Sequence, residues 1–483
     1  MAAIELHIDL STLVDAVVSG NRTEIVAVAR ELLQQGRAAD VLIGRIGLIA
    51  AQGDPDGHPT ITLTAAAMLS RMLHFMPAPP DSAEPPRERA LPLLAQALFA
   101  AIPAVQAGNT AQITYPEPFF PSALVGSDKT VDDVMREAVA QNDVVLAERV
   151  LLGLFGTGAD YRTMEVRSYD PLTTIFQDNG HPLQFAVRGF QLLDTVEWGD
   201  RAPVIIHWLA PHLPLRPQSN EPAWINQVRA YAAEPAHDLK SIRTRLTAPK
   251  DTEALAVRPV IQSEADTTQV CQAVYDALIR GGASPLGVAS VIALAAAETL
   301  QKVNEADQET FARIAHGLLY AAATRVIFQR VQDVEVLPIL FTAASYINVL
   351  YKEASAAKSQ GAATATAHAA PTTIPGGGLI ASTQLAALVA QLKANDMHAA
   401  TLTAERYINI GHDPRALFGA IGLVAAQIAT TSDQGLTLQV VQAAAEEFLA
   451  WPTALAATSR DVFLQLALRT AVRGQRDDLI ANL

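Results

Sequence analysis

The sequence predicts an all-α protein, a multi-unit array of antiparallel helices with internal pseudo-repeats. Three segments are versions of one pattern: GRAADVLIGRIGLIAAQ at 36–52, GASPLGVASVIALAAAE at 282–298 and GHDPRALFGAIGLVAAQ at 411–427. Each begins with a glycine that can end a helix in the left-handed conformation, and in the second and third versions an N-cap residue and a proline suited to the first helical turn follow. The chain is therefore expected to fold back, helix against helix.

The repeat extends beyond these segments. Residues 13–52 align with 388–427 without a gap, and an apolar helix follows each, at 62–73 and 437–449. Small residues recur at helical spacing in the second helix of both copies, and a glycine inside a helix costs about 1 kcal/mol relative to alanine. We therefore expect a neighbouring helix to approach these glycines closely: Gly44 and Gly47 in the first copy, Gly419 and Gly422 in the last.

Two further copies and the breaks between units predict the domain organisation. Residues 135–162 are a more divergent version of the same helix–loop–helix pattern. A clearer copy spans residues 268–353. The stretch 354–378 is rich in Ala, Thr and Gly and has almost no bulky apolar residues, so it is predicted to be a flexible linker. The expected units are 1–130, 131–250, 251–353, the linker 354–378, and a C-terminal unit, 379–483, related to the first.

Irregular segments are expected at two other places. The Pro-rich stretch FMPAPPDSAEPPRER at 75–89 is predicted to be a loop between helices, and LPLRPQSNEP at 213–222 another irregular link. The segment APVIIHWLAPHLP at 202–214 fits a short strand and a helix after Pro203 equally well.

Composition excludes several classes of protein. A formal net charge of -14 argues against a broad phosphate-binding face, so nucleic acid is not an expected partner. Cys271 is the only cysteine, which excludes an internal disulfide framework and a multi-cysteine zinc site. No membrane span is expected, because a charge, Gln or Pro interrupts every apolar stretch before about eighteen residues. The N-terminus has no basic region before an apolar run, so we expect a cytoplasmic protein.

At three places in the sequence, a histidine follows a glycine that we expect to adopt the left-handed backbone conformation. Gly57-His58-Pro59 and Gly180-His181-Pro182 are the same tripeptide opening two helices, and His412 lies in a related Gly-His-Asp-Pro sequence. One interpretation is structural, with Gly ending a segment and Pro starting the next helix. The other is functional: His58, His181 and His316, one from each of three units, would converge as metal ligands or proton carriers. None of these histidines belongs to a His-Glu-x-x-His motif or to a Glu-x-x-His pair of the di-iron bundle type.

Other candidate residues also have two readings. Asp160, Tyr161 and Arg162 follow a glycine-rich turn and could form a helix cap with an exposed Arg. Alternatively, Tyr161 and Arg162 could be polar wall residues of a pocket beside His181. Arg188 and Arg325 lie on helices that carry His181 and His316, and a buried Arg needs a partner, which makes an anionic ligand conceivable. No nucleophile motif of the Gly-x-Ser-x-Gly type is present.

Two segments carry a resemblance to a known family. Asp160-Tyr161-Arg162, then Gly180-His181, then Leu192-Leu193-Asp194 and Trp198 resemble the helical region that follows the iron-sulfur domain in a group of bacterial Rieske-type proteins. The segment 277–328, with His316 and Tyr320, resembles the next part of that region, and there is a looser similarity to questin oxidase-like proteins. Together the similarities cover residues 135–353. A Rieske cluster needs two Cys and two His, so no iron-sulfur cluster is expected here.

Two functions follow from these patterns. The resemblance implies an oxidoreductase or other small-molecule-handling enzyme with a pocket near His181, His316, Tyr161 and Arg162. The repeat favours a non-catalytic helical scaffold that binds a protein partner or forms a homodimer through its tethered C-terminal unit.

Overall fold

A computed structural model describes residues 9–78, 88–214, 221–234, 239, 249–304, 307–331, 333–360 and 380–483. Helices account for the regular structure of these residues, and the one β-type pairing among them is an isolated bridge between Ile428 and Arg476. The prediction of an all-α fold is confirmed. Residues 75–89 and 213–222 lie partly, and residues 361–378 of the expected linker wholly, outside the described residues.

The helices of the first half are α1 (Ser11–Ser19), α2 (Arg22–Gln34), α3 (Ala39–Gln52), α4 (His58–Met72), α5 (Leu91–Gly108), α6 (Val131–Ala140), α7 (Val144–Gly156), α8 (Tyr161–Tyr169), α9 (His181–Val196), α10 (Ala202–Leu209) and α11 (Ala223–Ala233). Those of the second half are α12 (Val257–Ile261), α13 (Thr267–Asp276), α14 (Pro285–Gln301), α15 (Gln308–Arg330), α16 (Ile339–Gln360), α17 (Ala381–Lys393), α18 (Met397–Asn409), α19 (Pro414–Ala425), α20 (Thr430–Asp433), α21 (Leu436–Leu449), α22 (Asp461–Ala471) and α23 (Asp478–Ala481). Short tight turns connect several of them, including η4 (Asp170–Leu172), η5 (Asp178–Gly180) and η7 (Ala210–His212).

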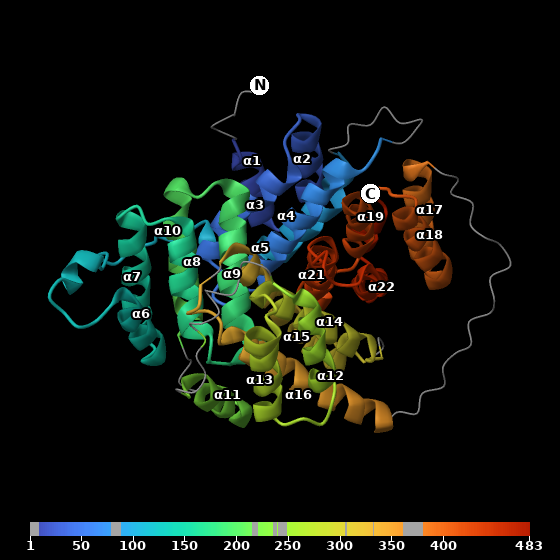
Figure 1. Ribbon diagram of the computed structural model, residues 1–483. Coiled ribbons are helices and arrows are strands. Elements are labelled where there is room, and N and C mark those ends of the chain that lie inside the picture. Colours follow the sequence, from blue (N-terminus) through green and yellow to red (C-terminus); the bar gives the residue numbers. More distant parts are fainter. Residues whose placement is uncertain are drawn as a thin grey trace.

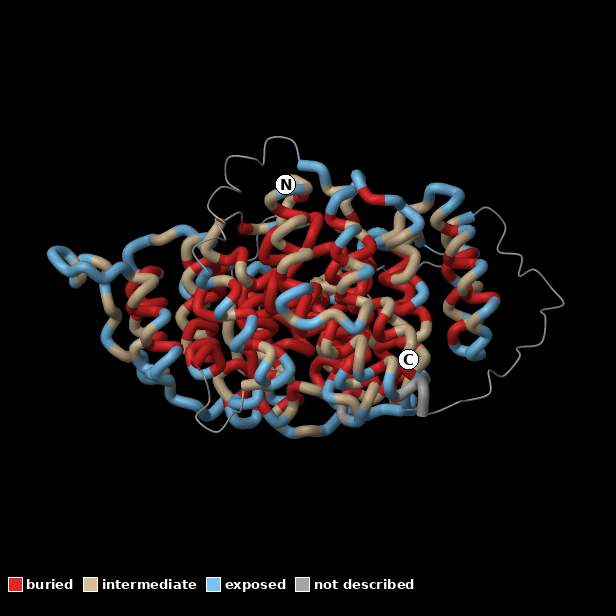
Figure 2. Tube along the Cα trace, turned by 60° about the horizontal axis from the view of Figure 1, so that its bottom comes forward, coloured by how far each residue is buried: buried red, intermediate tan, exposed pale blue. Residues whose placement is uncertain are grey.

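The molecule is elongated, with a helical hairpin at each end. Figure 1 shows α6 and α7 at one end and α17 and α18 at the other, with α3, α4, α9, α15 and α21 between them. Buried apolar side chains form one contiguous core that includes residues of every expected helical unit, and Figure 2 shows the buried residues running through the middle of the body. The units therefore do not have separate cores.

The glycines that start the three repeated segments end helices as predicted. Gly36, Gly282 and Gly411 have φ angles of 92°, 76° and 90°. Ser284 then caps α14 and Asp413 caps α19, each with a side chain that accepts a backbone N–H, and a proline follows each cap. The local rules of helix termination and capping thus fix these hairpins.

The interior glycines also lie where neighbouring helices approach closely. A Cβ atom at Gly44 would lie 2.6 Å from Cγ1 of Val196 on α9, and one at Gly419 would lie 3.1 Å from Cδ2 of Leu73, just beyond α4. The bounds of the helices keep the spacing of the sequence alignment, because α18 begins and ends 375 residues after α2. Close approach to α9 and α4 accounts for glycine at these positions.

The C-terminal unit packs on its own chain. α21 lies against α4 and α15, and Nε of Arg325 on α15 donates to Oε1 of Glu447 on α21 at 2.5 Å, with both side chains buried. On the neighbouring face, Arg188 of α9 donates to Oε2 of Glu446 at 3.2 Å. Two charged contacts therefore join the last unit to the second and third.

Three expectations about individual segments need comment. Residues 354–360 of the expected linker belong to α16, because the helix simply continues through Ala and Lys residues that favour it. Of the two readings of 202–214, the helix is correct, as α10. The segment Glu88–Gly108, which contains α5, is long and apolar enough to cross a membrane, but two thirds of its apolar window is buried in the protein. It packs against α3 and α4 as a core helix.

Candidate functional site

Two Gly-His-Pro tripeptides open α4 and α9 at the same place in the molecule. Gly57 and Gly180 both have a φ of 81°, so each left-handed glycine turns the chain and delivers a histidine to the first helical position. A Cβ at Gly57 would lie 2.6 Å from Cζ of Phe185, and one at Gly180 would lie 2.2 Å from Cδ2 of Tyr320. Both backbone conformation and close packing therefore require glycine here.

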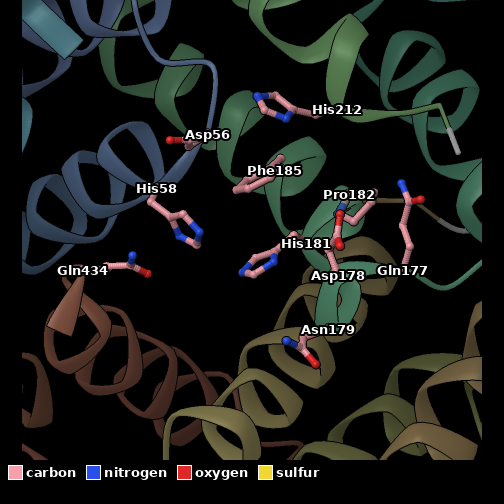
Figure 3. Close-up of a pocket in the computed structure, with 10 residues that line it drawn as sticks. All are labelled: Asp56, His58, Gln177, Asp178, Asn179, His181, Pro182, Phe185, His212 and Gln434. Carbon is pink, nitrogen blue, oxygen red and sulfur yellow. The ribbon is translucent and has the colours of Figure 1, made fainter. Parts of the chain in front are cut away.

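His58, His181 and His316 converge, as the functional reading of the sequence proposed. The ring centroid of His181 lies 4.8 Å from that of His58 and 4.7 Å from that of His316, and both contacts are edge to face. His58 comes from α4, His181 from α9 and His316 from the middle of α15. Figure 3 shows the imidazoles of His58 and His181 pointing toward one another across the opening between these helices. The three rings form a row, the histidine row, with His181 at its centre.

The histidine row borders a cavity of about 370 Å³. Phe185, one turn after His181 on α9, stacks on its ring with a centroid distance of 5.3 Å, and the ring of His212 lies 4.6 Å beyond Phe185. His316 lies behind His181 rather than in the wall itself. The wall, drawn in Figure 3, consists of Asp56, His58, Gln177, Asp178, Asn179, His181, Pro182, Phe185, His212 and Gln434.

The backbone of this wall is strained. Six residues other than glycine have positive φ in the described part of the chain, and three of them line the cavity: Asp178 at 47°, Asn179 at 54° and Gln434 at 53°. Left-handed conformation costs an L-residue on the order of 1–2 kcal/mol. Such strain is typical of functional sites, where a side chain must be aimed in one direction.

Burial lowers the pKa values of two members of the histidine row, His316 and His58. Burial, with a smaller contribution from the nearby His58, lowers the pKa of His316 to about 4. Burial also lowers the pKa of His58, against the opposing effects of Asp54 and Asp56. Among the described residues, Nδ1 of His316 has no hydrogen-bond partner. A neutral imidazole in this position can still accept a proton or a hydrogen bond.

The buried carboxylate of Asp54, which precedes His58 in the sequence, fixes the start of α4. Asp54 accepts hydrogen bonds from the backbone N–H of Gly57 at 2.8 Å and of Thr60 at 2.9 Å, and from the Thr60 hydroxyl at 2.6 Å. These bonds hold the turn that carries His58. The carboxylate of Asp54 is thereby committed to structure, whereas Asp56 two residues later is exposed and lines the cavity.

The geometry gives no support to a metal site at these histidines. Within the described residues, no group of three or more His, Cys, Asp or Glu side chains is arranged to hold a metal ion. The contacts of His181 with His58 and with His316 are edge-to-face ring contacts.

Tyr161 and Arg162 do not belong to this site, so the expectation that they form a wall beside His181 is wrong. Asp160 caps α8 by accepting the N–H of Thr163 at 2.7 Å, as the structural reading of that segment predicts. Tyr161 is 49% exposed and stacks on Trp198, with a centroid distance of 4.1 Å. Trp198 follows the far end of α9, whose 16 residues separate it from His181 by about 24 Å at 1.5 Å per residue.

Arg188 and Arg325 are not available to an anionic ligand, which corrects that suggestion as well. Their partners are Glu446 and Glu447 of α21, which the sequence places more than a hundred residues away. Glu165, another carboxylate close in sequence to these residues, pairs with Arg330 at the Trp198 end of α9, with Nη2 and Oε1 2.5 Å apart.

Several wall residues were missed by reasoning from the sequence. Phe185 had a usable signal, because a residue four positions after His181 shares its helix face. Gln434 had a weaker one, since Gln434-Gly435 precedes a helix as Asp56-Gly57 does. His212 had none, because only the packing of η7 against α9 brings it near Phe185.

Comparisons with protein-family models, with curated proteins and with solved structures find no match to this chain.

Proposed function

We propose that the protein is a small-molecule-handling enzyme and that the cavity beside the histidine row is its active site. The observation that carries this proposal is the placement of His181 between His58 and His316 at the edge of a cavity of about 370 Å³. That volume is at the lower end of the range of about 300–1,000 Å³ found for ligand pockets. The chemistry we assign to the row is proton transfer.

The close packing of the rings supports this chemistry. Because each neighbour of His181 lies within 5 Å by ring centroid, a proton on one imidazole disfavours a proton on the next. The low pKa of His316 makes this one ring a neutral acceptor at pH 7. In our proposal His58 and His181, which face the cavity, exchange a proton with the ligand, and His316 acts as a positioning residue behind them.

The redox character of the proposed enzyme depends on the resemblance alone. The similarity of residues 135–353 to the helical region of Rieske-type proteins and to questin oxidase-like proteins suggests an oxidoreductase. The cavity residues themselves supply acid–base groups and hydrogen bonds. We therefore place proton transfer first and oxidation of the same ligand second.

Turnover of a small-molecule library tests the proposal. The purified protein is incubated with a library of small metabolites, and depleted compounds are identified by mass spectrometry. We expect at least one compound to be consumed, and consumption to fall by about 10²–10⁴-fold in His181→Gln and His58→Gln, the usual contribution of a general acid or base. The matched control is His412→Gln, because His412 also follows a left-handed glycine but packs on Tyr407, away from the cavity. Equal turnover in all variants would remove the enzyme proposal.

A second candidate function, a scaffold for a protein partner, has one observation in its favour. The segment between α5 and α6 projects from the body in Figure 1 and exposes Tyr115 (41%), Phe120 (42%) and Val125 (87%). Exposed apolar side chains close together in sequence are typical of contact surfaces. Light scattering on the intact protein and on a Tyr115→Ser, Phe120→Ser, Val125→Ser variant tests whether this segment holds copies together.

A further inference from the structure

We infer that residues 115–121 are a preformed ligand for a protein partner that binds polyproline II segments in a groove lined by aromatic side chains. The segment lies between α5 and α6 and has the sequence YPEPFFP. This partner class deepens the second candidate function, the scaffold, on which it rests. It is independent of the histidine row.

The spacing of the prolines restricts the segment to an extended conformation. Proline fixes its own φ at about −65° and pushes the residue before it into the β or polyproline II region. Pro116, Pro118 and Pro121, each with the residue before it, leave Phe119 as the one position of 115–121 without such a restriction. Phe120 has φ −80° and ψ 141°, which match the polyproline II values of about −75° and +145°. The segment therefore already has the backbone of a proline-rich ligand.

Helix α7 holds one edge of this segment. The backbone N–H of Phe119 donates to the carbonyl oxygen of Arg149 at 2.8 Å, and Nε of Arg149 donates to the carbonyl oxygen of Glu117 at 2.8 Å. A Cβ at Gly153 would lie 1.9 Å from the carbonyl oxygen of Phe119, so glycine is what lets the segment approach α7 this closely. Because these contacts fix the backbone, a partner does not have to order it on binding.

Another edge of the segment faces solvent. A polyproline II helix has three residues per turn, so Glu117 and Phe120 share one edge and Phe119 lies on another. Phe119 packs against the core, whereas Glu117 is exposed and Phe120 is 42% exposed. Pro118 and Pro121 share the third edge and are half-buried. Since this part of the chain projects from the body in Figure 1, a groove can reach its exposed edge.

These properties fit recognition in an aromatic groove. Proline-rich segments bind in such grooves because their preformed backbone loses little entropy. Aromatic side chains in the groove can also pack against an exposed ring such as that of Phe120. Glu117 lies on the same exposed edge, and the whole chain has a formal net charge of -14. A groove with basic residues at its rim therefore complements this surface better than an acidic one.

Three kinds of isolated domain test this inference on the full chain. The probes are an SH3, a WW and an EVH1 domain, because each binds proline-rich segments in an aromatic groove. Each isotope-labelled domain is titrated with the unlabelled protein, and the signals of its groove are followed by NMR. We expect at least one domain to bind through its groove. Absence of binding by all three would overturn the inference, and so would binding through another surface of the domains.

The variant Phe120→Ser makes the test specific to the segment. It removes the exposed ring and keeps every proline, and we expect groove binding to weaken by about tenfold or more, as is usual when an aromatic anchor of an interface is truncated. The matched control is Leu402→Ser, because Leu402 is 43% exposed but lies on α18, at the other end of the molecule in Figure 1. Equal binding by the two variants would place the contact elsewhere and overturn the inference.

Light scattering separates the partner class from the scaffold function on which it rests. If the Tyr115→Ser, Phe120→Ser, Val125→Ser variant has a lower mass than the wild type and no domain binds, copies of the chain occupy the segment. The scaffold function then holds and the partner class fails. If a domain binds in a Phe120-dependent way and the wild type is a single chain, the partner class holds and contact between copies is excluded.

Discussion

Arg325 and Glu447 form a buried ion pair between α15 and α21, with Nε and Oε1 2.5 Å apart and both side chains almost fully buried. Removing one partner leaves a charge without compensation in the core, which typically costs 3–5 kcal/mol. We therefore expect Glu447→Ala to lower the free energy of unfolding by about that amount, as measured by urea denaturation followed by circular dichroism.

The double variant Arg325→Met, Glu447→Leu is the control for that prediction. Replacing both charges with apolar side chains of similar size removes the desolvation cost together with the attraction. The double variant should therefore be clearly more stable than Glu447→Ala. Equal stability of the two would mean that packing volume, and not charge, governs this contact.

Gly180 is expected to tolerate no side chain. An alanine there would adopt a φ of 81° and place its Cβ 2.2 Å from Cδ2 of Tyr320. Gly411→Ala is the matched variant, since its φ is 90° but nothing lies within 4 Å of the added Cβ. We expect Gly411→Ala to cost about 1–2 kcal/mol from the backbone alone, and Gly180→Ala to cost measurably more in the same denaturation assay.

The pKa of His316 predicts a dependence of stability on pH. Its pKa is about 4 in the folded protein and 6.5 in its ordinary state, so between these values the unfolded chain binds more protons. The contribution of His316 to stability is therefore complete above pH 6.5 and is lost as the pH falls toward 4. At pH 5 the loss is at most about 2 kcal/mol.

His316→Gln isolates this effect from the other titrating groups. The free energy of unfolding is measured at pH 7.5 and at pH 5 for wild type and variant, and the wild type should lose more stability between the two. Parallel losses would show that His316 titrates normally. The measured quantity is the difference between wild type and variant in this loss of stability. It is needed because burial raises the pKa values of Glu165 and Glu447 to about 7, and these two groups change the stability in the opposite direction over the same pH range.

Tyr161 is expected to have no effect on the cavity. Tyr161→Ala removes its stacking on Trp198, which is worth about 0.5–1.5 kcal/mol of stability, and leaves the histidine row unchanged. For any compound that the wild type consumes, kcat/KM should stay the same in Tyr161→Ala and fall in His181→Gln. A comparable fall in both variants would place Tyr161 in the active site after all.

The parts of this protein that sequence patterns predicted are those governed by local rules. The helix ends at Gly36, Gly282 and Gly411 depend on backbone conformation that only a few residue types adopt, and they lie where predicted. The convergence of His58 and His181 could be predicted from the sequence because each histidine starts a helix directly after a left-handed glycine of its own. The expectation for residues 354–360 failed because composition alone does not show where a helix stops.

The parts that sequence patterns missed depend on contacts between distant segments. Arg188 and Arg325 suggested an anionic ligand because their partners, Glu446 and Glu447, lie on a helix whose docking no local pattern specifies. Tyr161 was placed beside His181 because the two are near in sequence, whereas the length of α9 keeps them at opposite ends. Gln434 reaches the cavity only through the packing of α21 on α4.

Gln434 comes from a part of the sequence far from Asp56 and His58, and this separation has a consequence for biosynthesis. Asp56 and His58 leave the ribosome hundreds of residues before Gln434 does, and the carboxylates that neutralise Arg188 and Arg325 come later still. A nascent chain that lacks α21 therefore holds two guanidinium groups without these carboxylates. The wall of the cavity is completed, and both charges are neutralised, only after α21 has been synthesised and has packed against α4 and α15.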